Sequence, residues 1–299
     1  MTTKADYENP APVVAPNPPK KPLPAGACDS HAHVFGPYEQ FPGHPDRAYT
    51  PAAAGFDLYT GMLKRVGFTH GTPVHASVFL GFDASATLDA LDRDKNLRGI
   101  TVIDPKVTDK ELEDMNRRGI RGARFKMATA HNAAAAAALG AVGMDTLMAI
   151  APRFKALGWQ AQVWASTELL VAGAKDLEKT GLTIVLDHMA GIDVNKNVND
   201  PAFKSLMDML RDGRVWIKLS ANRVTKRFAD YEDVRPFHDA MVKANPDRLI
   251  WGSDWPYLRM YDNTPHVGWL IDKFDEWTGN DETVRRKVFA DNPKKLFGF

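Results

Sequence analysis

The chain has 299 residues, of which 44% are hydrophobic and 25% are charged, and this ordinary globular composition excludes a chain that is disordered throughout. Its 38 Lys and Arg residues nearly balance its 37 Asp and Glu residues, so the formal net charge of +1 gives no broad attraction for nucleic acid or an anionic membrane. Cys28 is the only cysteine, and the sequence shows no signal-peptide pattern and no run of about 20 apolar residues. We therefore expect a cytoplasmic protein without nucleic-acid or membrane partners.

Residues 1–24 form a proline-rich segment that holds seven of the 20 prolines. Proline lacks a backbone donor and restricts the chain, so we predict an extended arm followed by one folded domain at 25–299. The arm has two interpretations. It is either a solvated tail or a docking segment for another subunit of a homo-oligomer.

The folded part alternates short apolar runs with amphipathic segments, which predicts repeated βα units. Strands are expected at 26–34, 72–79, 98–104, 120–127, 159–165, 182–188, 214–220 and 247–254. Helices are expected at 56–66, 84–92, 108–118, 142–157, 167–179, 201–211, 231–244 and 265–278, with a final helix near 281–290. Eight βα pairs without a GxGxxG phosphate loop predict a single-domain (β/α)8 TIM-type barrel and not a doubly wound open sheet.

Three histidines and one aspartate lie where these strands end. His31 and His33 are two residues apart in the first strand, so both imidazoles leave the same face and point toward the barrel axis. His188 ends the sixth strand and Asp254 ends the eighth. Because barrel enzymes build their sites at the carboxyl ends of the strands, we expect these four side chains to meet at one mouth.

Other polar residues accompany this group. Asp29 shares the inward face of His31, and we expect it to orient its neighbours through hydrogen bonds. Asp187 is adjacent to His188, so strand alternation predicts that it points outward, into the outer layer of the barrel. Ser77, His75 and Trp164 lie near the ends of the second and fifth strands, where they either line a pocket or fill the core.

Four motifs follow one another between Asp29 and Phe297, and they read CDSHAH, VLDHMAG, LIWGSDWP and FADNPKKLF. Their order and spacing resemble the amidohydrolase superfamily, in particular its branch of lactonases for 2-pyrone-4,6-dicarboxylate and for sugar acids. The resemblance covers nearly the whole folded part of the chain. It implies a barrel hydrolase that acts on a small carboxylated lactone.

The same branch suggests residues that bind the substrate. HAHVFGP with Tyr49 further on, RGARF around Arg124, and SANR ending at Arg223 look like segments that line its pocket. The two arginines would provide planar forks for substrate carboxylates. There are two departures, because the branch has a second arginine after the RGARF-like motif and a tyrosine where this chain has Trp164. Lys126 or His131 could supply the missing charge.

The reaction implied is hydrolysis of a carboxylate-bearing lactone, which is either an intermediate of aromatic catabolism or the lactone of a sugar acid. Water attacks the ring carbonyl, Asp254 accepts its proton, and His31, His33 and His188 stabilise the oxyanion. These four residues would act either directly or through one Zn²⁺ or Mn²⁺, and we recognise no lysine or glutamate that would bridge two metals. The alternatives are a decarboxylase, a lactone isomerase, or a catalytically silent barrel that binds carboxylates.

Overall fold

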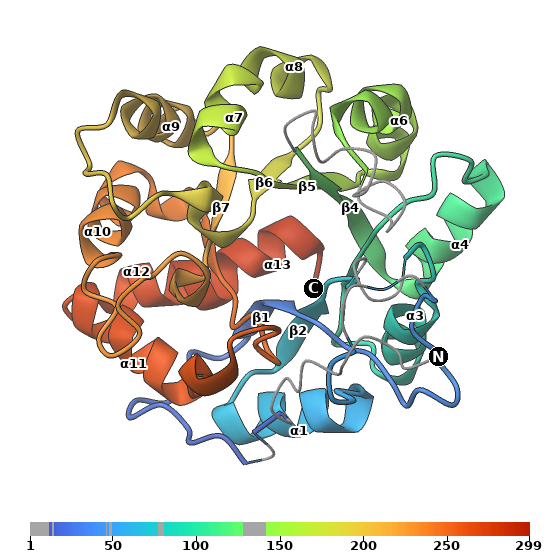
Figure 1. Cartoon of the computed structure of the whole chain (residues 1–299), viewed down its shortest axis with the longest axis horizontal. Coiled ribbons are helices and arrows are strands. Elements are labelled where there is room, and N and C mark those ends of the chain that lie inside the picture. Colours follow the sequence, from blue (N-terminus) through green and yellow to red (C-terminus); the bar gives the residue numbers. More distant parts are fainter. Residues whose placement is uncertain (1–11, 14, 46, 48–49, 77–80, 128–141) are drawn as a thin grey trace.

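The computed structural model describes residues 12–13, 15–45, 47, 50–76, 81–127 and 142–299. Within them, eight parallel strands surround a common axis and the helices lie outside (Figure 1). The strands are β1 (Cys28–Ala32), β2 (His70–Pro73), β3 (Gly99–Thr101), β4 (Ile120–Lys126), β5 (Gln160–Trp164), β6 (Ile184–Leu186), β7 (Trp216–Leu219) and β8 (Leu249–Trp251). Each falls on or beside a predicted strand, and β2 begins two residues earlier than expected.

The strands close into a barrel through short bridges. Strands β3 to β8 form one sheet in sequence order, and β1 pairs with β2 in a second sheet. Parallel bridges join Ala32 to Trp255 beyond β8, and Val74 beyond β2 to Ile100 of β3. At the first of these joins, His33 N donates to Trp255 O at 2.7 Å. The predicted (β/α)8 barrel is therefore confirmed.

The helices occupy most of the predicted segments. They are α1 (Phe56–Val66), α3 (Ser85–Arg93), α4 (Asp109–Arg118), α6 (Met144–Leu157), α7 (Thr167–Ala172), α8 (Ala174–Lys179), α9 (Pro201–Arg211), α10 (Arg235–Ala244), α11 (Val267–Trp277), α12 (Glu282–Arg286) and α13 (Asn292–Phe297). A π-helical turn, Lys287–Asp291, joins the last two, and short 3-10 turns are η2 (His188–Gly191), η3 (Ala221–Arg223), η4 (Pro246–Arg248) and η5 (Tyr261–Asn263). The single helix expected at 167–179 is divided at Gly173. Among the described residues, none of the helices has the length and apolar character that crossing a membrane requires.

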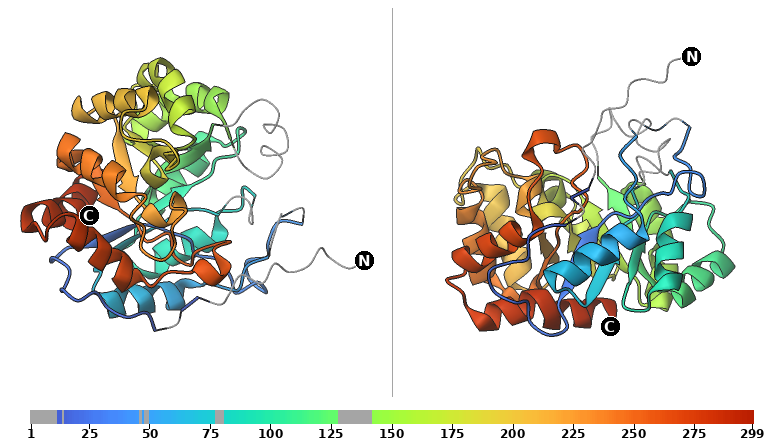
Figure 2. Two further views of the ribbon diagram at one scale, coloured as in Figure 1. Left: turned by 60° about the vertical axis from the view of Figure 1, so that its left-hand side comes forward. Right: turned by 90° about the horizontal axis from the view of Figure 1, so that it is seen from below.

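The inside of the barrel is apolar near the start of the strands. A cluster separate from the main core contains Val185, Trp216, Ile250 and Phe297. Phe297 belongs to α13, and this helix and the C-terminus lie at one end of the barrel (Figures 1 and 2). Its end is fixed there because Arg98, just before β3, donates to Gly298 O at 3.1 Å. The amino-terminal end of the barrel is thus filled by side chains.

The described part of the proline-rich arm lies against the barrel. Arg65 of α1 donates to Pro16 O at 2.8 Å, and Arg285 of α12 donates to Pro22 O at 2.7 Å. A side chain at Gly268 of α11 would come within 2.3 Å of Asn17 O, so the arm and this helix are in close contact. Residues 16–22 are thus held against the barrel by hydrogen bonds, while Asn17, Pro18, Lys20 and Pro22 remain exposed to solvent.

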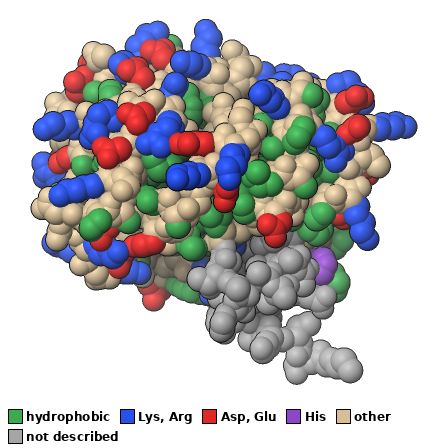
Figure 3. Space-filling model, turned by 90° about the horizontal axis from the view of Figure 1, so that it is seen from above, with side chains coloured by type: hydrophobic (Ala, Val, Ile, Leu, Met, Phe, Trp, Pro, Cys, Tyr) green, Lys and Arg blue, Asp and Glu red, His purple; other side chains and the backbone are tan. Residues whose placement is uncertain are grey.

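The surface of the folded part carries charges of both signs. On the face drawn in Figure 3, Lys and Arg side chains alternate with Asp and Glu side chains. This distribution agrees with the formal net charge of +1. Charged groups that could bind a small anionic or cationic substrate are therefore expected inside a cavity.

Candidate active site

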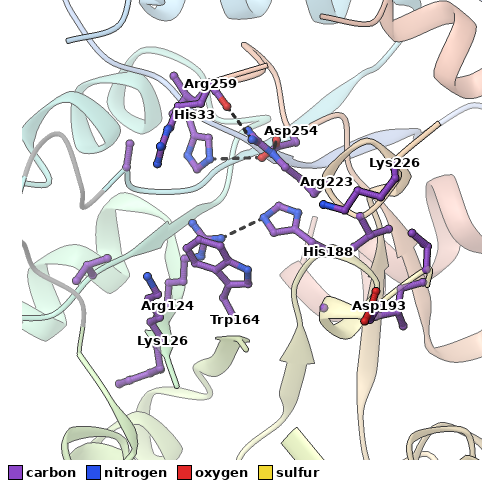
Figure 4. A pocket seen from close by; sticks show the side chains of 18 residues that line it. His33, Arg124, Lys126, Trp164, His188, Asp193, Arg223, Lys226, Asp254 and Arg259 are labelled. Atoms are coloured by element: carbon purple, nitrogen blue, oxygen red, sulfur yellow. Dashed lines mark hydrogen bonds and ion pairs between the residues drawn. The ribbon is translucent and has the colours of Figure 1, made fainter. Parts of the chain in front are cut away.

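A cavity of about 850 Å³ opens where the strands end (Figure 4). Its wall combines aromatic and apolar groups with charged ones, and the labelled lining residues are His33, Arg124, Lys126, Trp164, His188, Asp193, Arg223, Lys226, Asp254 and Arg259. Three of the four residues predicted to meet at the mouth are therefore in its wall. The fourth, His31, is fully buried, and its ring centroid lies 5.1 Å from that of His33.

Asp254 is held where the chain leaves β8. Its φ of 60° is in the left-handed region, and its backbone N donates to His31 O at 2.8 Å. The two strands approach this closely because position 252 is glycine, where a Cβ would lie 2.6 Å from that of His31. The Asp254 side chain forms an ion pair with Arg223, and its Oδ1 lies 3.5 Å from Nε2 of His31 and of His33.

The charge of Asp254 follows from these neighbours. Burial by itself would raise the pKa of Asp254, but its neighbours, the Arg223 guanidinium most of all, outweigh this effect and hold the pKa below the ordinary range. Burial lowers the pKa of His188 to about 3 despite the opposing effects of Asp254 and Asp187. An ionised carboxylate therefore faces neutral His188 at ordinary pH.

Asp187 lies inside the barrel, and the prediction that it points outward is wrong. Val185 pairs with Gln162, whose side chain bonds inside the barrel, so the residue two positions later also points inward. That residue is Asp187. His188 reaches the same cavity because the backbone turns, with φ of 47° at His188 and 52° at Met189. Strict alternation ends at β6, and both side chains face the site.

Lys218 is a residue of the site that sequence reasoning missed, as is Lys226 in the cavity wall. It lies in β7, is fully buried, and its Nζ donates to Gln162 Oε1 at 2.5 Å. The same Nζ lies 3.0 Å from His31 Nδ1 and 3.0 Å from Asp187 Oδ1. A lysine in the apolar run RVWIKLS was the available signal, because a buried charge needs partners.

The two predicted substrate arginines also neutralise carboxylates of the site. Arg124 Nε donates to Asp187 Oδ2 at 2.8 Å, while Nη2 lies 3.2 Å from His188 Nε2. Arg223 pairs with Asp254, and its Nη1 donates to Leu258 O at 2.7 Å. Their side chains are 14% and 24% exposed, so each still contributes surface to the cavity.

Lys218 and Arg124 together control Asp187. Burial would raise the pKa of Asp187, but the two cations outweigh it and hold the pKa well below its usual range. Burial lowers the pKa of Lys218, and the nearby Asp187 carboxylate acts against that effect. Burial and then Lys218 lower the pKa of His31. The floor of the site is thus a buried network in which each charge has a partner of opposite sign.

The remaining predicted residues are placed as follows. Trp164 is 38% exposed in the cavity wall, with Lys126 Nζ 4.7 Å from the centroid of one of its rings. His75 is fully buried beside the barrel. Asp29 is also buried, and its carboxylate accepts from Ser253 N at 2.8 Å, as expected for an orienting group. Tyr49, Ser77 and His131 lie outside the described residues.

Among the described residues, two groups of side chains bring possible metal ligands within 4.8 Å of one another. One is His31, His33 and Asp254, and the other is His31, Asp187 and His188. Imidazole and carboxylate are suitable ligands for Zn²⁺ and Mn²⁺. In the second group, however, Lys218 Nζ already lies 3.0 Å from both His31 Nδ1 and Asp187 Oδ1. A metal there would have to replace the ammonium group.

Comparison with known proteins identifies the family. The profile described as amidohydrolase matches residues 28–299, which is nearly the whole barrel. The chain belongs to the amidohydrolase family. The expected superfamily is thereby confirmed. Of the four residues predicted to meet at the mouth, His33, His188 and Asp254 line the cavity.

Several relatives match over more than nine-tenths of their length. The chain is 34% identical over 280 residues to 4-sulfomuconolactone hydrolase of Rhizobium radiobacter, covering 92% of this chain and 91% of that protein. It is 32% identical over 293 residues to 2-pyrone-4,6-dicarboxylate hydrolase of Comamonas testosteroni, covering 94% and 93%. The crystal structure of a probable 2-pyrone-4,6-dicarboxylic acid hydrolase from Acinetobacter baumannii, with citric acid bound, superimposes with a TM-score of 0.76 at 26% identity, covering 92% of this chain and 100% of that one.

Proposed function

We propose that this amidohydrolase opens a lactone that bears one or more anionic groups, carboxylates above all, by attack of water that Asp254 activates. The observation that carries the proposal is the position of Asp254. Its ionised carboxylate lies between the imidazoles of His31 and His33 in the wall of a cavity with several cationic side chains. The lactone-hydrolase names of the relatives support the same reaction class.

The proposed chemistry uses the residues of the cavity wall. Water attacks the ring carbonyl carbon and gives a proton to Asp254, while imidazole N–H groups stabilise the new oxyanion. The carbon–oxygen bond of the ring then breaks, Asp254 returns the proton to the leaving oxygen, and a hydroxy acid results. A substrate carboxylate competes with Asp254 for Arg223, which increases the proton affinity of Asp254 when it acts as a base.

His188 is suited to the oxyanion role. A guanidinium group has donors and no acceptor, so Arg124 Nη2, 3.2 Å away, donates to His188 Nε2. The proton of the neutral ring is then on Nδ1. That atom is buried without a hydrogen-bond partner among the described residues. An N–H group that lacks a partner in the free protein is available to a developing oxyanion.

The cations of the wall favour an anionic substrate. Arg124 and Arg223 are already paired with carboxylates. Lys126, which is half-buried, and Lys226, which is exposed, line the cavity, and within the described part of the chain their ammonium groups have no carboxylate partner. We propose that these four side chains bind the carboxylates or sulfonates of the lactone.

The test is a panel of lactones with the purified protein and a pH indicator, because each ring opening releases one acid. The panel pairs carboxylated and sulfonated lactones with uncharged lactones of the same ring, and the product is identified by mass. We expect turnover of the anionic members, with gain of one water. Release of CO2 would indicate a decarboxylase, and a product that keeps its ring would indicate an isomerase. Tight binding without turnover would indicate a silent barrel.

A further inference from the structure

We propose that Lys218 is a positioning residue that holds His31 in the tautomer with its proton on Nε2, so that His31 is a hydrogen-bond donor in the site and not a metal ligand. The consequence for catalysis rests on the proposed lactone hydrolysis. The tautomer and the metal affinity can both be measured without any substrate.

The first step is the environment of Lys218 Nζ. Three acceptor atoms surround it, namely Gln162 Oε1 at 2.5 Å, Asp187 Oδ1 at 3.0 Å and His31 Nδ1 at 3.0 Å. An ammonium group has three N–H donors and no acceptor, and two of these donors form hydrogen bonds with Gln162 Oε1 and His31 Nδ1. The contact with Asp187 Oδ1 is an ion pair without hydrogen-bond geometry. The buried carboxylate of Asp187 is paired with this ammonium group and with Arg124. Lys218 therefore donates to His31 Nδ1.

The second step follows from the imidazole ring. In a neutral imidazole one nitrogen accepts and the other carries the proton. Since Nδ1 of His31 accepts from Lys218, its proton is on Nε2. That nitrogen is buried without a hydrogen-bond partner among the described residues, and its distance of 3.5 Å from Asp254 Oδ1 is longer than a hydrogen bond. His31 thus offers a free donor close to Asp254.

His33 provides an internal contrast within the same motif. Its Nδ1 lies 2.7 Å from Val74 O, and a carbonyl oxygen can only accept. The proton of neutral His33 is therefore on Nδ1, and its Nε2 carries the lone pair. The two rings are close to perpendicular, with an interplanar angle of 87°. Adjacent histidines of one strand face are consequently held in opposite tautomers by different partners.

The tautomer of His31 is incompatible with a metal ion bound by His31, His33 and Asp254. A metal bound to His31 Nε2 would require that nitrogen to lose its proton. If the proton moved to Nδ1, an N–H group would face the ammonium group of Lys218 at 3.0 Å. Two donors would then oppose each other in a fully buried place. The residues as arranged do not fit a divalent ion, because Lys218 already supplies the positive charge.

The direct experiment is NMR of the full chain with ¹⁵N-labelled histidine, after treatment with EDTA. The His31 signals are assigned by their loss in His31→Gln. We expect a His31 ring protonated on Nε2 and a His33 ring protonated on Nδ1, and we expect one equivalent of Zn²⁺ to leave the His31 signals unchanged. A His31 ring protonated on Nδ1, or one that binds Zn²⁺ through Nε2, would overturn the proposal.

The second experiment compares Lys218→Met with Lys243→Met, a control on the exposed surface of α10. We expect Lys218→Met to populate the other His31 tautomer, to bind Zn²⁺ about tenfold more tightly, and to lower kcat about 100-fold. The control should match the wild type in all three. Wild-type tautomers and zinc affinity in a folded Lys218→Met protein would overturn the proposal. If that variant does not fold, the wild-type spectrum decides the question.

An absence of lactone turnover in every protein would count against the proposed function alone. The tautomer and zinc results would still decide the role of Lys218, because neither needs a substrate.

Discussion

The inside of the barrel has two layers of opposite character that are separated by only two residues along a strand. Val185 of β6 belongs to the apolar layer, and Asp187, directly after this strand, belongs to the charged one. On β7, Trp216 and Lys218 have the same relation. Phe297 of α13 packs into the apolar layer from the end of the barrel. One set of strands thus combines a hydrophobic plug with a buried ionic site.

The difference shows how the barrel divides stability from chemistry. Burial of the side chains in the apolar layer contributes stability in proportion to the apolar area removed from water. Burying a charge is costly unless it is paired, and here Asp187 lies between Lys218 and Arg124, while Asp254 pairs with Arg223. We expect substitutions in the apolar layer to change the free energy of unfolding at constant kcat, and substitutions in the charged layer to change kcat.

The largest effect is expected for Asp254→Asn in the charged layer. The amide cannot accept a proton from water, so kcat should fall about 10³-fold or more with the best lactone of the panel. Binding of a non-hydrolysable carboxylate should persist, because Arg223 remains available. The exposed Asp262→Asn is the matched control. An Asp254→Asn protein with wild-type kcat would show that another group activates the water.

Phe297→Ala tests the apolar layer. Its side chain is 1% exposed, and deleting a buried phenylalanine leaves a cavity, so the free energy of unfolding should fall by about 3 to 4 kcal/mol. Denaturant titration measures this loss, and kcat should stay at the wild-type value. Phe228→Ala removes a phenylalanine that is 40% exposed and should cost far less. A large loss of kcat in folded Phe297→Ala would mean that the layers are coupled.

His75, which is buried beside the barrel, should make the stability of the fold depend on pH. Burial lowers the pKa of His75 to about 4 from an ordinary value of 6.5, although Gly81 and Asp83 oppose the shift. The unfolded chain therefore binds more protons between these values, and stability falls as the pH falls through this window. From about pH 7 to about pH 5, His75 should account for a loss of about 2 kcal/mol.

Thermal or denaturant unfolding at the two pH values measures this term. His75→Leu should remove it and flatten the pH dependence of stability, whereas the exposed His266→Leu should not. An unchanged slope in His75→Leu would mean that the folded protein accepts a proton at this position as easily as the unfolded chain.

The barrel could be predicted because its signals are local. Apolar runs between amphipathic segments identify strands and helices, and residues at strand ends identify the mouth. His31 and His33 could be placed relative to each other because a regular strand alternates its side chains. The helix at 56–66 was predicted with its observed bounds, since its apolar spacing ends at Gly67 in a left-handed cap.

Asp187 and Lys218 could not be placed by the same rules. If the chain alternated regularly, His188 could point inward only if Asp187 pointed outward. In the structure the backbone is left-handed after β6, so His188 points inward while Asp187 also faces the barrel axis. Lys218 lies in an apolar run, and its partners Gln162 and His31 come from strands far away in sequence. Only the closed barrel brings these groups together.

The smallest expected effect is that of Lys226→Met at the rim. Lys226 lines the cavity but is exposed, so water and salt screen its attraction for a substrate anion. We expect KM for a dianionic lactone to rise about 2- to 5-fold at unchanged kcat, and the difference from wild type to disappear in high salt. Lys243→Met should leave KM unchanged. A fall in kcat would place Lys226 among the groups that act on the transition state, and the charged layer would then extend to the rim.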